Sequence, residues 1–84
     1  MPEYISAELL RWMVVLANEH GFSAAAEELH IDPSVLRAQT HELSTRIGCQ
    51  IFQEMEDLVE LTEGGRALVN ASREYLAWLE KQKK

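Results

Sequence analysis

Apolar residues in the first third of the chain recur at the spacing of two helices. One buried stripe, with the i, i+3, i+4, i+7, i+8 pattern, predicts a helix that Ser6 caps and that runs to about His20: Leu9, Trp12, Met13, Leu16 and Ala17. Gly21 follows as its expected terminator. Ser23 is then expected to cap a second helix, from Ala24 to about Leu29, whose consecutive alanines allow close packing beside Phe22 as a core anchor.

A third helix is predicted from Pro33 to about Ile47, after a tight connection at His30 and Ile31. Asp32 is a favoured N-cap residue, proline at the first helical position needs no N–H of its own, and Gly48 is the expected terminator. The periodicity assigns one face to the interior: Leu36, Thr40, Leu43 and Ile47. It assigns the other face to the outside: Ser34, Arg37, Ala38, His41, Ser44 and Thr45.

The rest of the chain predicts a hairpin and a long helix. Residues 50–53 and 58–61 are partly alternating apolar segments, with Met55-Glu56-Asp57 between them. Thr62 is expected to cap a last helix from Glu63 to about Lys83, with a wide apolar stripe: Leu68, Ala71, Tyr75, Leu76, Trp78 and Leu79. The fold class is therefore mainly α, with a three-helix core and a two-stranded hairpin in residues 1–62 and a long helix in residues 63–84.

Composition limits the function. The 84 residues allow one domain with a modest core, and 46% hydrophobic and 26% charged residues are typical of a globular protein. No apolar run reaches the roughly 20 residues of a membrane span, and the N-terminus lacks a signal-peptide pattern. Cys49 is the only cysteine, which excludes an intrachain disulfide and favours the reducing cytoplasm.

Candidate reactive residues are few. His20, His30 and His41 include no i, i+4 pair and no neighbouring cysteine cluster, so we expect no metal site. Cys49 follows the third helix and is expected to pack half-buried, without a redox role. No catalytic carboxylate pair, phosphate loop or nucleophile motif occurs, so neither an enzyme, nor a cofactor, nor a small-molecule site is expected in this segment.

Three segments of the sequence follow one known pattern, with no gap between them, over some seventy residues: Phe22–Leu29, Leu43 with Ile47–Phe52, and Leu61–Leu68. Together they resemble the N-terminal domain of LysR-type transcriptional regulators. The resemblance implies a winged helix-turn-helix, in which the hairpin is the wing and the third helix enters the major groove of double-stranded DNA. It also implies that the last helix is a linker helix that pairs with its twin in a homodimer.

The resemblance assigns candidate residues to both roles. DNA contacts are expected from Ser23, Pro33, Ser34, Arg37, Ala38 and His41, with Arg37 suited to a guanine. Dimer contacts are expected from Leu68, Tyr75, Trp78 and Leu79. A rod of about twenty residues extends ~30 Å, which is longer than so small a domain can cover.

The acidic charge of the chain argues against DNA binding. The net charge is −6, whereas DNA-binding domains usually present a basic face. The wing has Glu54, Asp57 and Glu60 where the family favours arginine, and Pro33 and Arg37 each stand one place earlier than its pattern. A degenerate winged helix that acts through protein partners therefore stays open as an alternative. These residues lack the family's effector-binding domain. If they are the head of a longer regulator, DNA binding is favoured. If they form a stand-alone protein, the partner-binding alternative is favoured.

Overall fold

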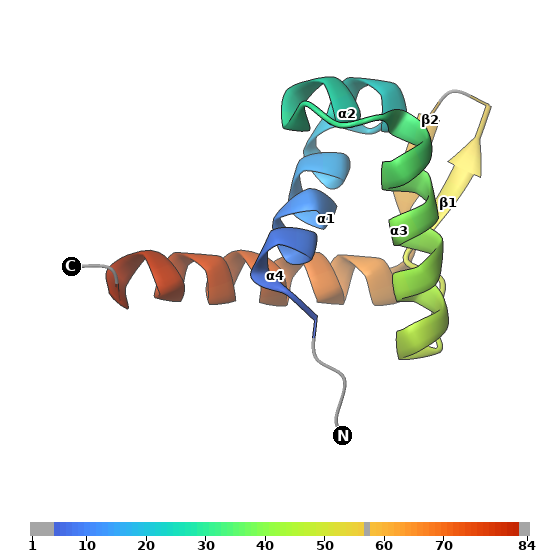
Figure 1. Ribbon diagram of the computed structural model, residues 1–84. Helices are drawn as coiled ribbons and strands as arrows, with labels where there is room; N and C mark the ends of the chain where they lie inside the picture. The colour runs from blue at the N-terminus through green and yellow to red at the C-terminus, as the bar shows by residue number, and fades with distance from the viewer. Residues whose placement is uncertain (1–4, 57, 83–84) are drawn as a thin grey trace.

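The computed structural model describes residues 5–56 and 58–82, and it contains the predicted order of elements. These are α1 (Ala7–Glu19), α2 (Phe22–Leu29), α3 (Pro33–Ile47), β1 (Phe52–Met55), β2 (Leu58–Leu61) and α4 (Glu63–Gln82). In Figure 1, α1 stands across α4, α2 lies over the far end of α1, and α3 runs beside the hairpin. The mainly helical fold class with a two-stranded wing is confirmed.

The core lies where α1, α2, α3, the hairpin and α4 meet. Its fully or almost fully buried hydrophobic residues are Met13, Leu16, Ala25, Ala26, Leu36, Leu43, Ile51, Phe52, Val59 and Val69. The buried pair of alanines in α2 has the small side chains that close helix packing requires, as the sequence predicts. Leu9, Trp12 and Ala17 of the predicted stripe are half-buried and pack against this core.

The ends of α1, α2 and α3 confirm the caps predicted at Ser6 and Gly48 and correct those predicted at Gly21 and Ser23. Ser6 accepts a hydrogen bond from the Leu9 N–H (3.1 Å), and Gly48 ends α3 in the left-handed conformation at φ 70°. However, α1 ends at His20 (φ 61°) and not at Gly21, since histidine is among the residues that adopt this conformation more readily than most. Gly21 is extended and caps α2, which therefore starts at Phe22 and leaves Ser23 exposed in its first turn.

The hairpin begins later than predicted. Strand β1 starts at Phe52 and not at residue 50, because the Ile51 N–H donates to Ser44 Oγ of α3 (3.3 Å) and not across the hairpin. The antiparallel register pairs Phe52 with Leu61, Gln53 with Glu60, Glu54 with Val59, and Met55 with Leu58. The N–H of Val59 also donates to the His20 carbonyl (2.9 Å), which fixes the wing to the end of α1.

The end of α3 is more exposed than predicted. Ile47, expected on the inner face, is 38% exposed, while Leu36, Thr40 and Leu43 are buried. Ile51, which is fully buried, supplies the apolar side chain at this end of the core. Cys49 lies in the turn after Gly48 and is exposed, which corrects the expected half-buried packing.

Helix α4 has a buried half and a protruding half. Thr62 Oγ1 accepts from the Gly65 N–H (3.0 Å) and caps it as predicted. Val69 and Ser72 are buried, and Arg73 donates to Asn18 Oδ1 of α1 (2.7 Å). Beyond this contact α4 extends away from the other elements, at the left of Figure 1.

Candidate nucleic-acid interface

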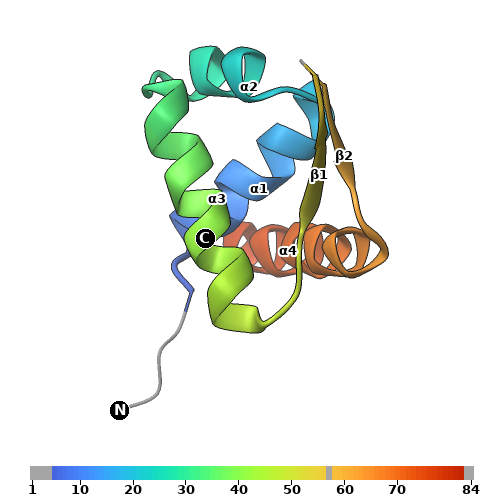
Figure 2. The same cartoon turned by 90° about the vertical axis from the view of Figure 1, so that its right-hand side faces the viewer.

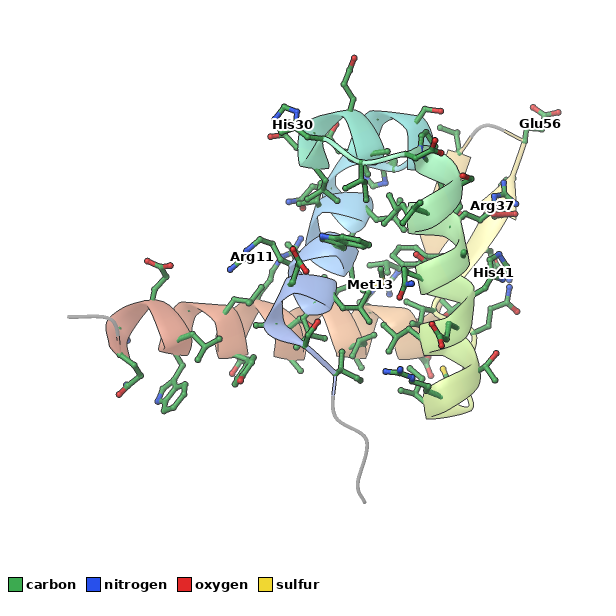
Figure 3. The ribbon with its side chains drawn as sticks, viewed as in Figure 1. Arg11, Met13, His30, Arg37, His41 and Glu56 are labelled. Atoms are coloured by element: carbon green, nitrogen blue, oxygen red, sulfur yellow. The ribbon has the colours of Figure 1, made fainter. Side chains whose placement is uncertain are left out.

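One face of α3 is open along its first two turns. Ser34, Arg37, Ala38 and His41 are all exposed, at the i, i+3, i+4, i+7 spacing of a single helical face. Figure 3 shows Arg37 and His41 pointing from α3 toward the hairpin. The predicted outer face is therefore a real surface, bounded on one side by the wing.

The start of α3 is held by its own cap. Asp32 Oδ1 accepts from the Ser34 N–H (2.8 Å) and from the Ser34 hydroxyl (2.7 Å). These two hydrogen bonds stabilise the carboxylate and lower the pKa of Asp32 below its ordinary value of 3.8. The Ser34 hydroxyl, a candidate for base contact, therefore donates to Asp32, while Pro33 is exposed beside it in the first turn.

Arg37 is held from two sides. Its Nη1 lies 3.0 Å from both Glu54 Oε1 and Glu54 Oε2 on the wing. Its guanidinium carbon lies 5.1 Å from the centre of the Phe22 ring, within the range of a cation–π contact. His41 Nε2, one turn along α3, lies 4.0 Å from Glu54 Oε1. Glu54 therefore belongs to the same surface as the predicted contact residues, a role that the sequence reasoning missed.

Glu54 and Glu60, two of the acidic residues predicted to act together on the wing, lie on opposite faces of the hairpin. Because side chains alternate along a strand, Glu54 shares a face with Phe52, and its cross-strand partner is the buried Val59. Glu60 pairs with Gln53 on the opposite face, away from α3. Asp57, the third carboxylate of the predicted group, lies outside the described residues. The alternation already present in the sequence is the signal that separates Glu54 from Glu60.

A cleft of about 470 Å³ lies between the start of α2 and the wing, and both Ser23 and Arg37 line it. Glu19, Glu54 and Glu56 line it too, so acidic side chains outnumber the one arginine. The structure thus brings Ser23 to the same cleft as Arg37. Pro33, Ser34, Ala38 and His41 lie outside it, farther along or around α3.

The predicted dimer residues divide between the two halves of α4. Leu68 is half-buried and packs against the domain's own core. Tyr75 and Trp78, 44% and 54% exposed, stack with their ring centres 6.3 Å apart on the protruding half. Leu79 follows there, half-buried. An aromatic pair of this size is thus open on the part of α4 beyond its contact with α1.

Two observations cover residues 5–56 and 58–82. Within these ranges no group of three or more histidine, cysteine or acidic side chains could hold a metal ion. Within the same ranges no helix has the length and apolar character to cross a bilayer.

Residues 7–66 match the family model for bacterial regulatory helix-turn-helix proteins of the lysR family. The chain is 34% identical over 71 residues to a RuBisCO operon transcriptional regulator of Acidithiobacillus ferrooxidans. The aligned segment covers 84% of this chain and 23% of that protein. It is 32% identical over 72 residues to the HTH-type transcriptional regulator TfdT of Cupriavidus pinatubonensis, with 86% and 32% covered. The chain thus spans about a quarter to a third of these relatives, and none of them favours the alternative of a partner-binding module.

Solved structures agree in fold. A full-length OxyR variant from Pseudomonas aeruginosa is 28% identical, with a TM-score of 0.87 over 95% of this chain and 27% of that one. The DNA-binding domain of CbnR, in a complex with DNA, is 22% identical, with a TM-score of 0.89 over 94% of this chain and 91% of that one. At that identity the second likeness shows the fold alone.

Proposed function

The chain belongs to the lysR family of bacterial regulatory helix-turn-helix proteins, and we propose that it binds double-stranded DNA as the winged helix domain of a transcription regulator, with α3 in the major groove. The observation that supports this most is the open face of α3, where Arg37 and His41 stand beside the wing. An α-helix fits the major groove, and arginine is the commonest reader of guanine there. A regulator of this kind acts in the cytoplasm, where bacterial DNA lies.

Within this proposal each candidate contact has a distinct role. Arg37 reads a base edge, and His41 extends the same face one turn farther on. Ser23 and Pro33 lie near the backbone of the duplex, at the first turns of α2 and α3. Ala38 offers a methyl group, which suits apolar contact with the methyl group of a thymine. Ser34 contributes through the cap, because its hydroxyl is bonded to Asp32.

We also propose that two copies pair through the protruding half of α4, with residues 63–84 as the dimerisation helix. Tyr75 and Trp78 leave a large aromatic surface uncovered, and Leu79 follows on the same half. Aromatic residues of this kind are enriched in the buried centres of protein interfaces. A dimer places one recognition helix on each of two half-sites.

A DNA titration tests the function. Fluorescence anisotropy with a mixed-sequence duplex, at about 50 and 200 mM salt, is expected to show binding with a shallow salt dependence, because few cations face the duplex. Arg37→Ala is expected to weaken binding. Arg11→Ala is the matched control: Arg11 is exposed on α1 and points away from α3 in Figure 3. Equal loss in both variants, or no binding at either salt concentration, contradicts the proposal.

A further inference from the structure

Glu54 is the only residue of the described part of the wing that the structure joins to α3 by an ion pair. Its strand position explains this contact. Phe52, two residues earlier, is buried, and Val59, opposite Glu54, is also buried, so the Glu54 side chain points inward from the hairpin. Figure 2 shows α3 and the hairpin on neighbouring sides of the domain, meeting at their lower ends. The Glu54 carboxylate spans the space between them, because its Oε1 lies 3.0 Å from Arg37 Nη1 of α3.

The Glu54 carboxylate binds the Arg37 guanidinium in the way that a phosphate would. Both carboxylate oxygens lie 3.0 Å from the same nitrogen, Nη1, and the Phe22 ring limits where the guanidinium can move. A carboxylate and a phosphate offer arginine the same chemistry, which is negatively charged acceptor oxygens at hydrogen-bond distance. The pair has no net charge, so Arg37 adds little to the attraction of DNA while the pair is closed.

The pair is nevertheless weak enough to open. The side chains of Arg37 and Glu54 are 53% and 33% exposed. Exposed pairs of this kind favour the closed state by a factor of at most about five. A duplex that offers Arg37 a well-placed guanine can therefore compete with Glu54, whereas a phosphate at an arbitrary position gains less from the exchange and also approaches the carboxylate itself.

We propose that Glu54 is a specificity-determining residue that acts as an internal competitor for Arg37. It lowers the sequence-independent part of DNA affinity, because it withholds the arginine from phosphates until a base contact replaces the ion pair. This inference rests on the proposed function, in which α3 faces DNA. The Glu54 carboxylate thus makes DNA binding more selective, and its presence on the wing does not mean that DNA binding is lost.

The test is a double-mutant cycle on a mixed-sequence duplex. Glu54→Gln keeps the shape of the side chain and removes its charge. It is expected to raise affinity about three- to tenfold at 50 mM salt, and to make affinity fall about threefold more between 50 and 200 mM, as one added phosphate contact would. Glu60→Gln is the matched control, since it removes the same charge from the outer face of the same hairpin. It is expected to change affinity less than twofold and to leave the salt dependence unaltered.

The cycle also includes Arg37→Ala with and without Glu54→Gln. In the Arg37→Ala background, Glu54→Gln is expected to raise affinity less than it does when Arg37 is present. It then removes only the repulsion between the carboxylate and the duplex, and it releases no arginine. Circular dichroism melts of each variant establish that the fold is intact. Equal effects of Glu54→Gln and Glu60→Gln, or an equal gain with and without Arg37, overturn the inference while DNA binding stands. A loss of affinity in Glu54→Gln overturns it too, since Glu54 would then support the Arg37 contact. Failure of every variant to bind any duplex overturns both the inference and the proposed function.

Discussion

Replacing Gly65 with alanine is expected to destabilise the whole domain, although the residue lies in a helix. A Cβ built on Gly65 lies 2.8 Å from the carbonyl carbon of Ile51 and 3.1 Å from its Cα, and still closer to the carbonyl oxygen. Backbone atoms cannot rotate away as a side chain can, so either α4 or the segment that leads into the wing must shift. The contact therefore determines how closely α4 approaches the start of the hairpin.

The magnitude follows from what the shift disturbs. The Ile51 carbonyl accepts from the Thr62 N–H (3.0 Å) and from Thr62 Oγ1 (3.1 Å). Each such bond contributes about 0.5–1.5 kcal/mol, and overpacking costs about 1–3 kcal/mol. Alanine regains about 1 kcal/mol of helix propensity. The expected net loss is about 2–4 kcal/mol, a large part of the roughly 4–12 kcal/mol available to a domain of this size.

Urea denaturation followed by circular dichroism measures this loss, which corresponds to a Tm lowered by about 10–25 °C. Gly64→Ala is the matched control. A Cβ there meets only the Cys49 side chain, which is exposed and can rotate, so we expect a loss below about 1 kcal/mol. If Gly65→Ala is as stable as Gly64→Ala, the close approach to Ile51 does not constrain the fold and the reasoning is refuted.

Three further outcomes are expected. Replacing Trp78 and Leu79 together with glutamate gives a monomer in sedimentation equilibrium, whereas a monomeric unaltered chain at high micromolar concentration refutes the dimer. Arg37→Ala relaxes preference at one base position in a selection from randomised duplexes, at a cost of ~1–3 kcal/mol; unchanged preference at every position excludes it as a reader. Since the pKa of Asp32 is lowered in the folded state, its cap stabilises the fold fully above pH 3.8, and this stability is lost as pH falls through the lowered value. Asp32→Asn therefore unfolds with a weaker pH dependence in acid, and an unchanged acid limb contradicts this.

Local chemistry made most of the elements predictable. Ser6, Asp32 and Thr62 accept hydrogen bonds from the first turns of their helices, and Gly48 ends α3 with a positive φ, each as its residue type suggests. These signals need no tertiary contact, because the group that is satisfied lies within three residues of the cap.

The structure differs from the prediction where segments far apart in the sequence compete for the same hydrogen bond or the same place in the core. The start of β1 depends on Ser44, seven residues away, which takes the N–H of Ile51. The exposure of Ile47 depends on which side chain fills the end of the core, and helical periodicity alone does not decide that.

The candidate surface shows the same division. The outer face of α3 could be predicted from helical spacing alone. The pairing of Arg37 with Glu54 joins residues seventeen positions apart, and it requires both the inner face of the wing and its distance from α3. The sequence contained half of this information, because Glu54 stands two residues after the apolar Phe52 and alternation along a strand places both on one face.

The two halves of α4 also have a geometric consequence. Val69 and Ser72 fix one end of a single uninterrupted helix to the body of the domain, while Tyr75 and Trp78 lie at its other end. In the proposed dimer this helix sets both the separation and the relative rotation of the two recognition helices. One residue inserted between Ser72 and Tyr75 would turn each domain by about 100° around the helix axis and move it by about 1.5 Å. Both recognition helices would then face different positions along the duplex, although every contact within each domain would be unchanged.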